Sequence, residues 1–72
     1  MKHQINKYDK QHDVLHVFLA SQENSSADEE FPGIYVHRND DTEMIVGFTI
    51  MDFSRNKEQV QKLYPQYDFS IV

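Results

Sequence analysis

The sequence predicts an α+β fold, a small antiparallel β-meander of three to four strands followed by one C-terminal helix. Two observations indicate this class. Short runs rich in β-branched and aromatic residues are separated by polar turns, which is typical of strands. The last apolar residues before a proline recur at helical spacing. Because the chain has 72 residues, we expect one small domain over residues 1–72 with a marginal hydrophobic core.

The first two strands are expected on either side of a polar turn near the N-terminus. Residues 4–8 form the first candidate strand, with Ile5 as their one aliphatic residue, and residues 14–20 form the second, which is rich in β-branched and aromatic residues. Asp9 and Asp13 stand at the two ends of the turn, where aspartate side chains can accept hydrogen bonds from turn amides.

An acidic segment, residues 21–30, interrupts the pattern of strands. It reads SQENSSADEE, with one alanine as its single apolar residue and no basic residue. We interpret it as a flexible, solvated loop. Its four carboxylates belong to Glu23, Asp28, Glu29 and Glu30.

Two further strands are expected over residues 34–38 and 44–53, joined by a turn rich in Asn and Asp. Short connections between consecutive strands favour antiparallel pairing. Gly47 lies inside the second of these strands, which predicts a β-bulge or the close approach of a neighbouring segment.

The last element is expected to be a short helix. Ser54 or Asn56 is the candidate N-cap, and Pro65 ends the helix. The apolar residues at helical spacing are Val60, Leu63 and Tyr64. Residues 66–72 form a tail that either adds an edge strand or docks loosely.

The second face of the predicted sheet is the most informative feature of the sequence. One short helix covers only one face of a sheet, yet alternation places apolar residues on both faces. The second face must therefore contact the tail, a second subunit or a partner protein. Ile45 is assigned to this face. The candidate interaction residues on it are Val14, Phe18, Tyr35 and Met51.

Three stretches resemble the pattern of a known family. Residues 8–17, YDKQHDVLHV, resemble a Y-D-x-x-x-D-x-L-x-[IV] opening. Residues 33–36, GIYV, and 45–54, IVGFTIMDFS, resemble a G-[IV]-x-V and V-G-[IF]-x-[IL]-x-D-x-S continuation. This pattern is similar to that of a family of small bacterial proteins catalogued as a domain of unknown function. The resemblance implies a β-meander with a C-terminal helix and a bacterial or phage origin, and it provides no catalytic residues to carry over. Because members of such families sometimes sit beside small toxins, it also implies that an antitoxin-like or inhibitor-like role is possible.

Composition narrows the classes of function. Seven basic and twelve acidic residues give a net charge of −5, which argues against direct nucleic-acid binding. Cysteine is absent, which excludes disulfides and thiolate metal sites. No stretch is long and apolar enough to span a bilayer, and no signal peptide is evident, so we expect a cytoplasmic protein without membrane contact.

We expect neither a cofactor nor a metal ion nor a catalytic centre. The histidines are His3, His12, His16 and His37; His16 and His37 fall on the second face, but two histidines without a third ligand make a poor zinc site. The acid–base candidates Asp9, Asp13 and Asp52 each have a structural role available. Ser54 lacks the strained glycine turn that exposes a nucleophile.

The sequence therefore predicts a non-enzymatic protein-interaction module. The acidic segment favours a protein partner with a basic surface, because exposed charges accelerate the encounter of complementary partners. The alternative is a homo-oligomeric module, such as a dimer, with no external ligand.

Overall fold

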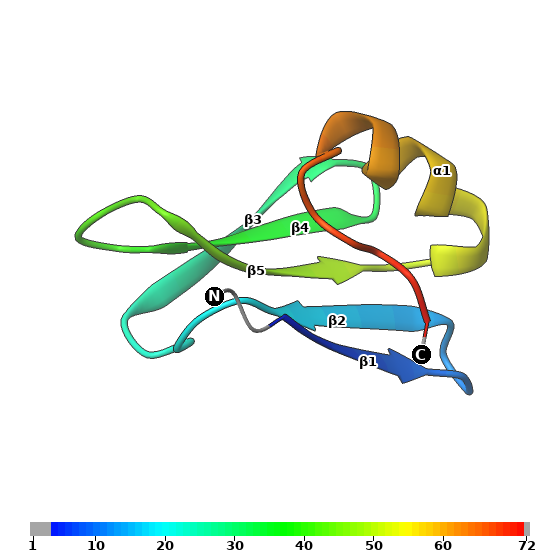
Figure 1. Cartoon of the computed structure of the whole chain (residues 1–72), viewed down its shortest axis with the longest axis horizontal. Coiled ribbons are helices and arrows are strands. Elements are labelled where there is room, and N and C mark those ends of the chain that lie inside the picture. The colour runs from blue at the N-terminus through cyan, green and yellow to red at the C-terminus, as the bar shows by residue number, and fades with distance from the viewer. Residues whose placement is uncertain (1–3, 72) are drawn as a thin grey trace.

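The computed structural model describes residues 4–71 and contains a five-stranded antiparallel sheet with one C-terminal helix, which confirms the α+β class (Figure 1). The elements are β1 (Ile5–Asp9), β2 (Val14–Phe18), β3 (Ser25–Phe31), β4 (Ile34–Asn39), β5 (Ile45–Ile50) and α1 (Phe53–Leu63). The strands lie in the order β1-β2-β5-β4-β3. The meander is thus formed by β3, β4 and β5, and the β1–β2 hairpin extends it beyond β5.

The fifth strand corrects the predicted number of three to four strands. It is β3, which occupies most of the acidic segment that we interpreted as a flexible loop, and it pairs with β4. Pro32-Gly33 joins the two strands. Proline fixes φ near about −65°, and Gly33 has a φ of 81°, which is the combination of a type II turn. The five central residues of β3 are exposed, so backbone hydrogen bonds rather than apolar side chains hold this edge strand.

A β-bulge in β5 corrects the assignment of one residue to the second face. His37 is paired with Gly47 and Arg38 with Ile45, so Val46 is the additional residue. Ile45 consequently packs against the core, although simple alternation placed it on the opposite side. Val46 is buried but does not belong to the core cluster.

The core lies between one face of the sheet, the helix and the tail. Its buried members are Leu15, Val17, Ile34, Val36, Phe48, Ile50, Phe53, Val60 and Phe69. Phe48 lies at the centre, with its ring centroid 5.0 Å from those of Tyr64 and Phe69. Residues of the sheet, the helix and the tail therefore depend on one another for burial.

Helix α1 begins at Phe53, earlier than a cap at Ser54 or Asn56 would allow. Asp52 occupies the N-cap position with a φ of 48°, and its side chain makes no capping hydrogen bond. The cap comes instead from the β1–β2 turn. The carboxylate of Asp13 accepts hydrogen bonds from the backbone N–H of Ser54 at 3.1 Å and from its hydroxyl at 3.0 Å.

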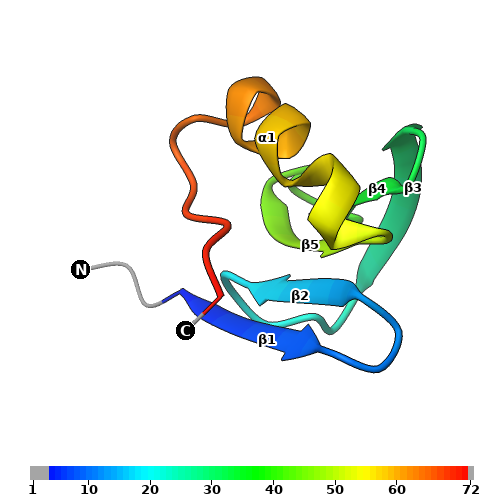
Figure 2. The same ribbon diagram turned by 90° about the vertical axis from the view of Figure 1, so that its right-hand side faces the viewer.

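The tail, residues 66–72, is described except for its last residue, and it docks on the core without forming a strand. Phe69 is only 3% exposed. The side-chain amide of Asn6 on β1 donates to the carbonyl oxygens of Asp68 and Ser70, both at 2.9 Å. Figure 2 shows the tail and α1 on the same side of the sheet.

Candidate interaction surface

On the face of the sheet that points away from α1 and the tail, residues 4–71 place no helix or further strand layer, although the connection between β2 and β3 brings Gln22 over Gly47 (Figure 2). We call this face the open face. Residues on it alternate with the core residues along each strand. The strand registers arrange ten of them in two rows that cross all five strands. The first row is Ile5, Phe18, Gly47, His37 and Ala27, and the second row is Lys7, His16, Thr49, Tyr35 and Glu29.

The predicted interaction residues differ in how much surface they offer. Phe18 and Tyr35 lie on the open face and are partly exposed. Val14 has the same orientation along β2 but is only 6% exposed, so it contributes little contact area. Met51 lies just beyond the end of β5 and is 41% exposed.

Gly47 lies where another segment approaches the sheet closely. A Cβ atom at this position would be 2.6 Å from the carbonyl oxygen of Val17 and 3.2 Å from the side-chain amide of Gln22. Gln22 is held there because its Nε2 donates to the carbonyl oxygens of Ala20 at 2.8 Å and Val46 at 2.7 Å. Both the bulge and the close approach predicted for Gly47 are confirmed.

Two histidines lie on the open face. Nε2 of His37 is within hydrogen-bond distance, 2.8 Å, of the Thr49 hydroxyl. Burial, and secondly the charge of His16, lowers the pKa of His37 below its usual 6.5. His16 and His37 are separated by β5, and the ring of His16 stacks on Phe18 with centroids 6.4 Å apart. Among residues 4–71, no three side chains of the metal-ligating types gather; His3 lies outside this range.

The four carboxylates of the acidic segment do not form one cluster. They are Glu23, Asp28, Glu29 and Glu30. Asp28 and Glu29 are consecutive in β3 and therefore point to opposite faces. Glu29 accepts a hydrogen bond from the backbone N–H of Gly33 at 2.9 Å, and Glu30 forms an ion pair with Arg38. Glu23 lies in the turn before β3 and is exposed, as is Asp28.

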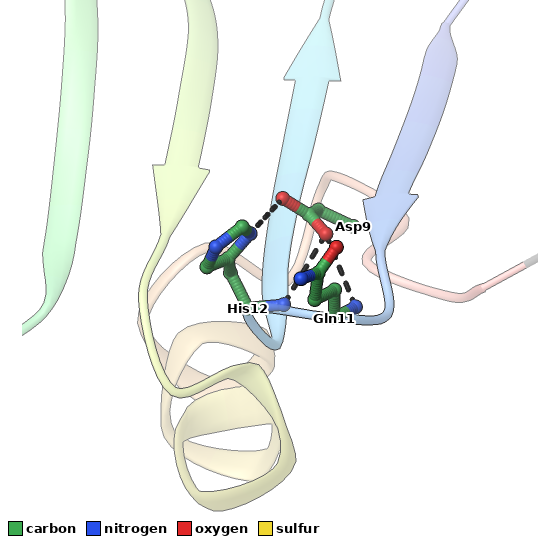
Figure 3. Close-up of polar contacts among 3 residues, drawn as sticks. All are labelled: Asp9, Gln11 and His12. Carbon is green, nitrogen blue, oxygen red and sulfur yellow. Dashed lines mark hydrogen bonds and ion pairs between the residues drawn. The ribbon is translucent and has the colours of Figure 1, made fainter.

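Asp9, a candidate for acid–base chemistry, organises the β1–β2 turn (Figure 3). Its Oδ1 accepts hydrogen bonds from the backbone N–H groups of Gln11 at 3.1 Å and His12 at 3.2 Å. Its Oδ2 lies 2.8 Å from Nδ1 of His12, and this contact is the main reason why the pKa of Asp9 is lowered. The aspartate is thus used for turn formation, as predicted.

Asp13 connects β1, the turn and the helix. The Tyr8 hydroxyl donates a hydrogen bond to Oδ1 of Asp13 at 2.6 Å, next to the contacts from Ser54. These hydrogen bonds, with that of Tyr8 the strongest, lower the pKa of Asp13, and the same bond raises the pKa of Tyr8. The carboxylate of Asp13 therefore holds β1, the turn and the start of the helix together.

A shallow hollow of about 430 Å³ lies on the side of the sheet that carries the tail. Its lining consists of Gln4, Leu19, Ala20, Met44, Ile45, Gln66 and Tyr67. The lining is largely apolar, and its polar side chains are the amides of Gln4 and Gln66 and the hydroxyl of Tyr67.

The described chain is thus a small α+β protein whose one distinctive surface is the open face of its sheet. Residues 6–54 match the family described as "Protein of unknown function (DUF2283)", and the chain belongs to this family. The matched residues run from β1 to the start of α1 and include the sheet except for Ile5, the first residue of β1. The resemblance seen in the sequence is thereby confirmed at the level of a small domain of unknown function.

No curated protein and no solved structure gave a significant match to the chain. None of the helices in the described part of the chain is both long and apolar enough to cross a membrane.

Proposed function

We propose that this protein is a non-enzymatic protein-interaction module and that the open face is its contact surface. The observation that carries the proposal is the uneven covering of the sheet. Helix α1 and the tail pack on one face, whereas Phe18 and Tyr35 remain partly exposed on the other. The uncovered face of an antiparallel sheet is usually polar, and aromatic side chains are enriched at protein interfaces.

The roles of the turn carboxylates support a non-enzymatic function. A carboxyl group that acts as a general acid or base must face a substrate site. Asp9 and Asp13 instead hold turn and helix amides, and their pKa values are lowered, so both are charged at neutral pH.

The charge of the protein favours a partner with a basic surface. The net charge is −5, and the carboxylates of Glu23 and Asp28 are exposed. Exposed acidic groups raise the association rate with a basic protein and leave the dissociation rate largely to the apolar contacts. Inhibition of a basic toxin or nucleic-acid enzyme in a bacterium or phage is one form of such binding.

A second candidate function is that of a homo-oligomeric module without an external ligand. It is favoured by the second row of the open face, which has a cationic residue, Lys7, at one end and an anionic residue, Glu29, at the other.

The proposed function is tested by comparing which proteins are retained by three versions of the chain. The wild-type chain, Phe18→Asp and Ile71→Asp are used as baits under the same conditions. Ile71 is the matched control, because it is 51% exposed and belongs to the tail, away from the open face. We expect a basic protein to be retained by the wild type and the control and lost by Phe18→Asp. If the folded Phe18→Asp variant, verified by circular dichroism, retained the same proteins, the open face would not be the contact surface.

A further inference from the structure

We infer that the open face contacts a second copy of this chain, in a dimer whose two-fold axis runs close to parallel to β5. The inference rests on the proposed use of the open face as a contact surface and names the occupant of that face when no external partner is bound. It follows from the order of side chains across the sheet, which the sequence alone does not reveal.

The charged ends of the second row are complementary under this symmetry. Lys7 is exposed on one edge strand, β1, and Glu29 is exposed on the other, β3, with β5 midway between them. When a second sheet is turned over about an axis along β5, its β3 lies opposite β1 of the first. Lys7 then lies opposite Glu29 of the second copy, and the same pair forms again at the other end because a two-fold interface is isologous.

The alternative two-fold axis, perpendicular to the strands, gives a less favourable contact. It places β1 opposite β1, and when it runs through the second row it brings Lys7 opposite Lys7 and Glu29 opposite Glu29 of the second copy. Like charges that face each other across a contact destabilise it. The charges therefore select the axis along β5.

The uncharged side chains of the two rows also match under this axis. His16 lies opposite Tyr35 of the second copy, and Phe18 lies opposite His37. Each of these pairs brings an imidazole against an aromatic ring, and offset stacking of such rings is favourable. Thr49 lies at the centre of the second row and meets Thr49 of the second copy, whereas Gly47 at the centre of the first row is covered by Gln22, so the second row supplies the central contact. Two twisted sheets pack face to face with their strands roughly aligned, which this arrangement requires.

The size of the face predicts a weak dimer. Five strands spaced about 4.8 Å apart and about six residues long cover roughly 400 Å² on each copy. Interfaces that bury less than about 1,200 Å² in total belong to the transient class. We therefore expect dissociation constants in the range of about ten to a hundred micromolar.

Charge exchange between the two copies tests this geometry. Lys7→Glu and Glu29→Lys should each weaken self-association about tenfold, because two attractive pairs become repulsive. An equimolar mixture of the two variants should associate at least as well as the wild type, since each copy then supplies the charge that the other needs. Asp28→Lys is the matched control, since Asp28 is the neighbour of Glu29 in β3 and points to the opposite face. Sedimentation equilibrium at several concentrations measures all four samples and the wild type.

Cross-linking gives a second measurement that does not depend on charge. The chain has no cysteine, so single cysteines can be placed without background. A mixture of Lys7→Cys and Glu29→Cys should be joined by a short thiol-reactive linker more readily than Lys7→Cys alone. Because the cross-linking does not use Glu29→Lys, it tests the dimer even if that variant does not fold.

Two results would overturn the inference. One is a wild-type chain that stays monomeric up to several hundred micromolar; the other is a mixture of the variants that associates no better than each alone. The proposed function would survive either result if Phe18→Asp still lost a captured basic protein. Conversely, the mixed variants could form the dimer again while Phe18→Asp captured the same proteins as the wild type. The second copy would then be the occupant of the open face, and the proposal of an external partner at that face would be wrong.

Discussion

Phe69→Ala is expected to destabilise the protein strongly, although Phe69 belongs to a terminal tail. The side chain is 3% exposed and packs edge-on against Phe48, with ring centroids 5.0 Å apart and an interplanar angle of 77°. The tail is also held by the side chain of Gln61, whose Nε2 donates to the carbonyl oxygen of Tyr67 at 2.7 Å. The core is therefore incomplete without the tail.

The magnitude follows from the buried area. A buried phenylalanine removes roughly 150–200 Å² from water, and at about 25 cal/mol per Å² this is about 4–5 kcal/mol. Alanine keeps part of that area, and a terminal segment can relax, so we expect a loss of about 3 kcal/mol. For 72 residues at about 0.05–0.15 kcal/mol each, the whole free energy of unfolding is about 4–11 kcal/mol. The midpoint of thermal unfolding should then fall by about 12–24 °C.

Urea and thermal unfolding followed by circular dichroism measure this effect. Ile71→Ala is the matched control, because Ile71 is in the same tail but 51% exposed, and it should change the free energy of unfolding by less than about 0.5 kcal/mol. If Phe69→Ala behaved like this control, the tail would not be part of the core, and the reasoning from burial would be wrong.

Three further predictions concern the sheet and its polar contacts. Gly47→Ala should cost about 1–3 kcal/mol through overpacking against the Val17 carbonyl oxygen; a change below about 0.5 kcal/mol in urea unfolding would contradict the close approach. Asp13→Asn should be less stable than the wild type at pH 7. Because the pKa of Asp13 is lowered in the folded protein, the carboxylate stabilises the fold at pH values above its usual pKa of 3.8. This stabilisation is lost as the pH falls through the lowered pKa, so the unfolding curves of Asp13→Asn and the wild type should converge in acid. By NMR, His37 should titrate below pH 6.5, and His16→Gln should raise that midpoint only partly, since burial is the larger cause; a wild-type midpoint at or above 6.5 would disprove this.

The strands with several core residues were predictable, and β3, which contributes only its last residue, Phe31, to the core, was missed. β2, β4 and β5 place apolar residues at alternate positions, which is the signal that a half-buried strand leaves in a sequence. β3 places its carboxylates in solvent and pairs through its backbone, so it leaves no such signal. The dipeptide Pro32-Gly33 was the available clue, because a two-residue turn before a strand indicates a preceding strand.

Features that depend on tertiary structure could not be predicted from local patterns. The helix cap comes from Asp13, 41 positions away from Ser54, whereas capping rules consider only neighbouring residues. The row that joins Lys7 to Glu29 depends on the insertion of β5 between β2 and β4. Phe18 and Tyr35 were assigned to the second face correctly because alternation within a strand is local. Ile45 was misassigned because a bulge changes that alternation.

The position of β5 also determines how the chain folds. It is the last of the five strands along the chain, yet it lies in the middle of the sheet. The β1–β2, β3–β4 and β4–β5 pairings are local, but an isolated hairpin is at best marginally stable in water. Joining them requires contacts such as Leu15 with Ile50, and closing so long a loop carries an entropic cost before any burial compensates for it. We therefore expect the pairing of β2 with β5 to be the cooperative step, so that each half of the sheet becomes stable only when both halves do.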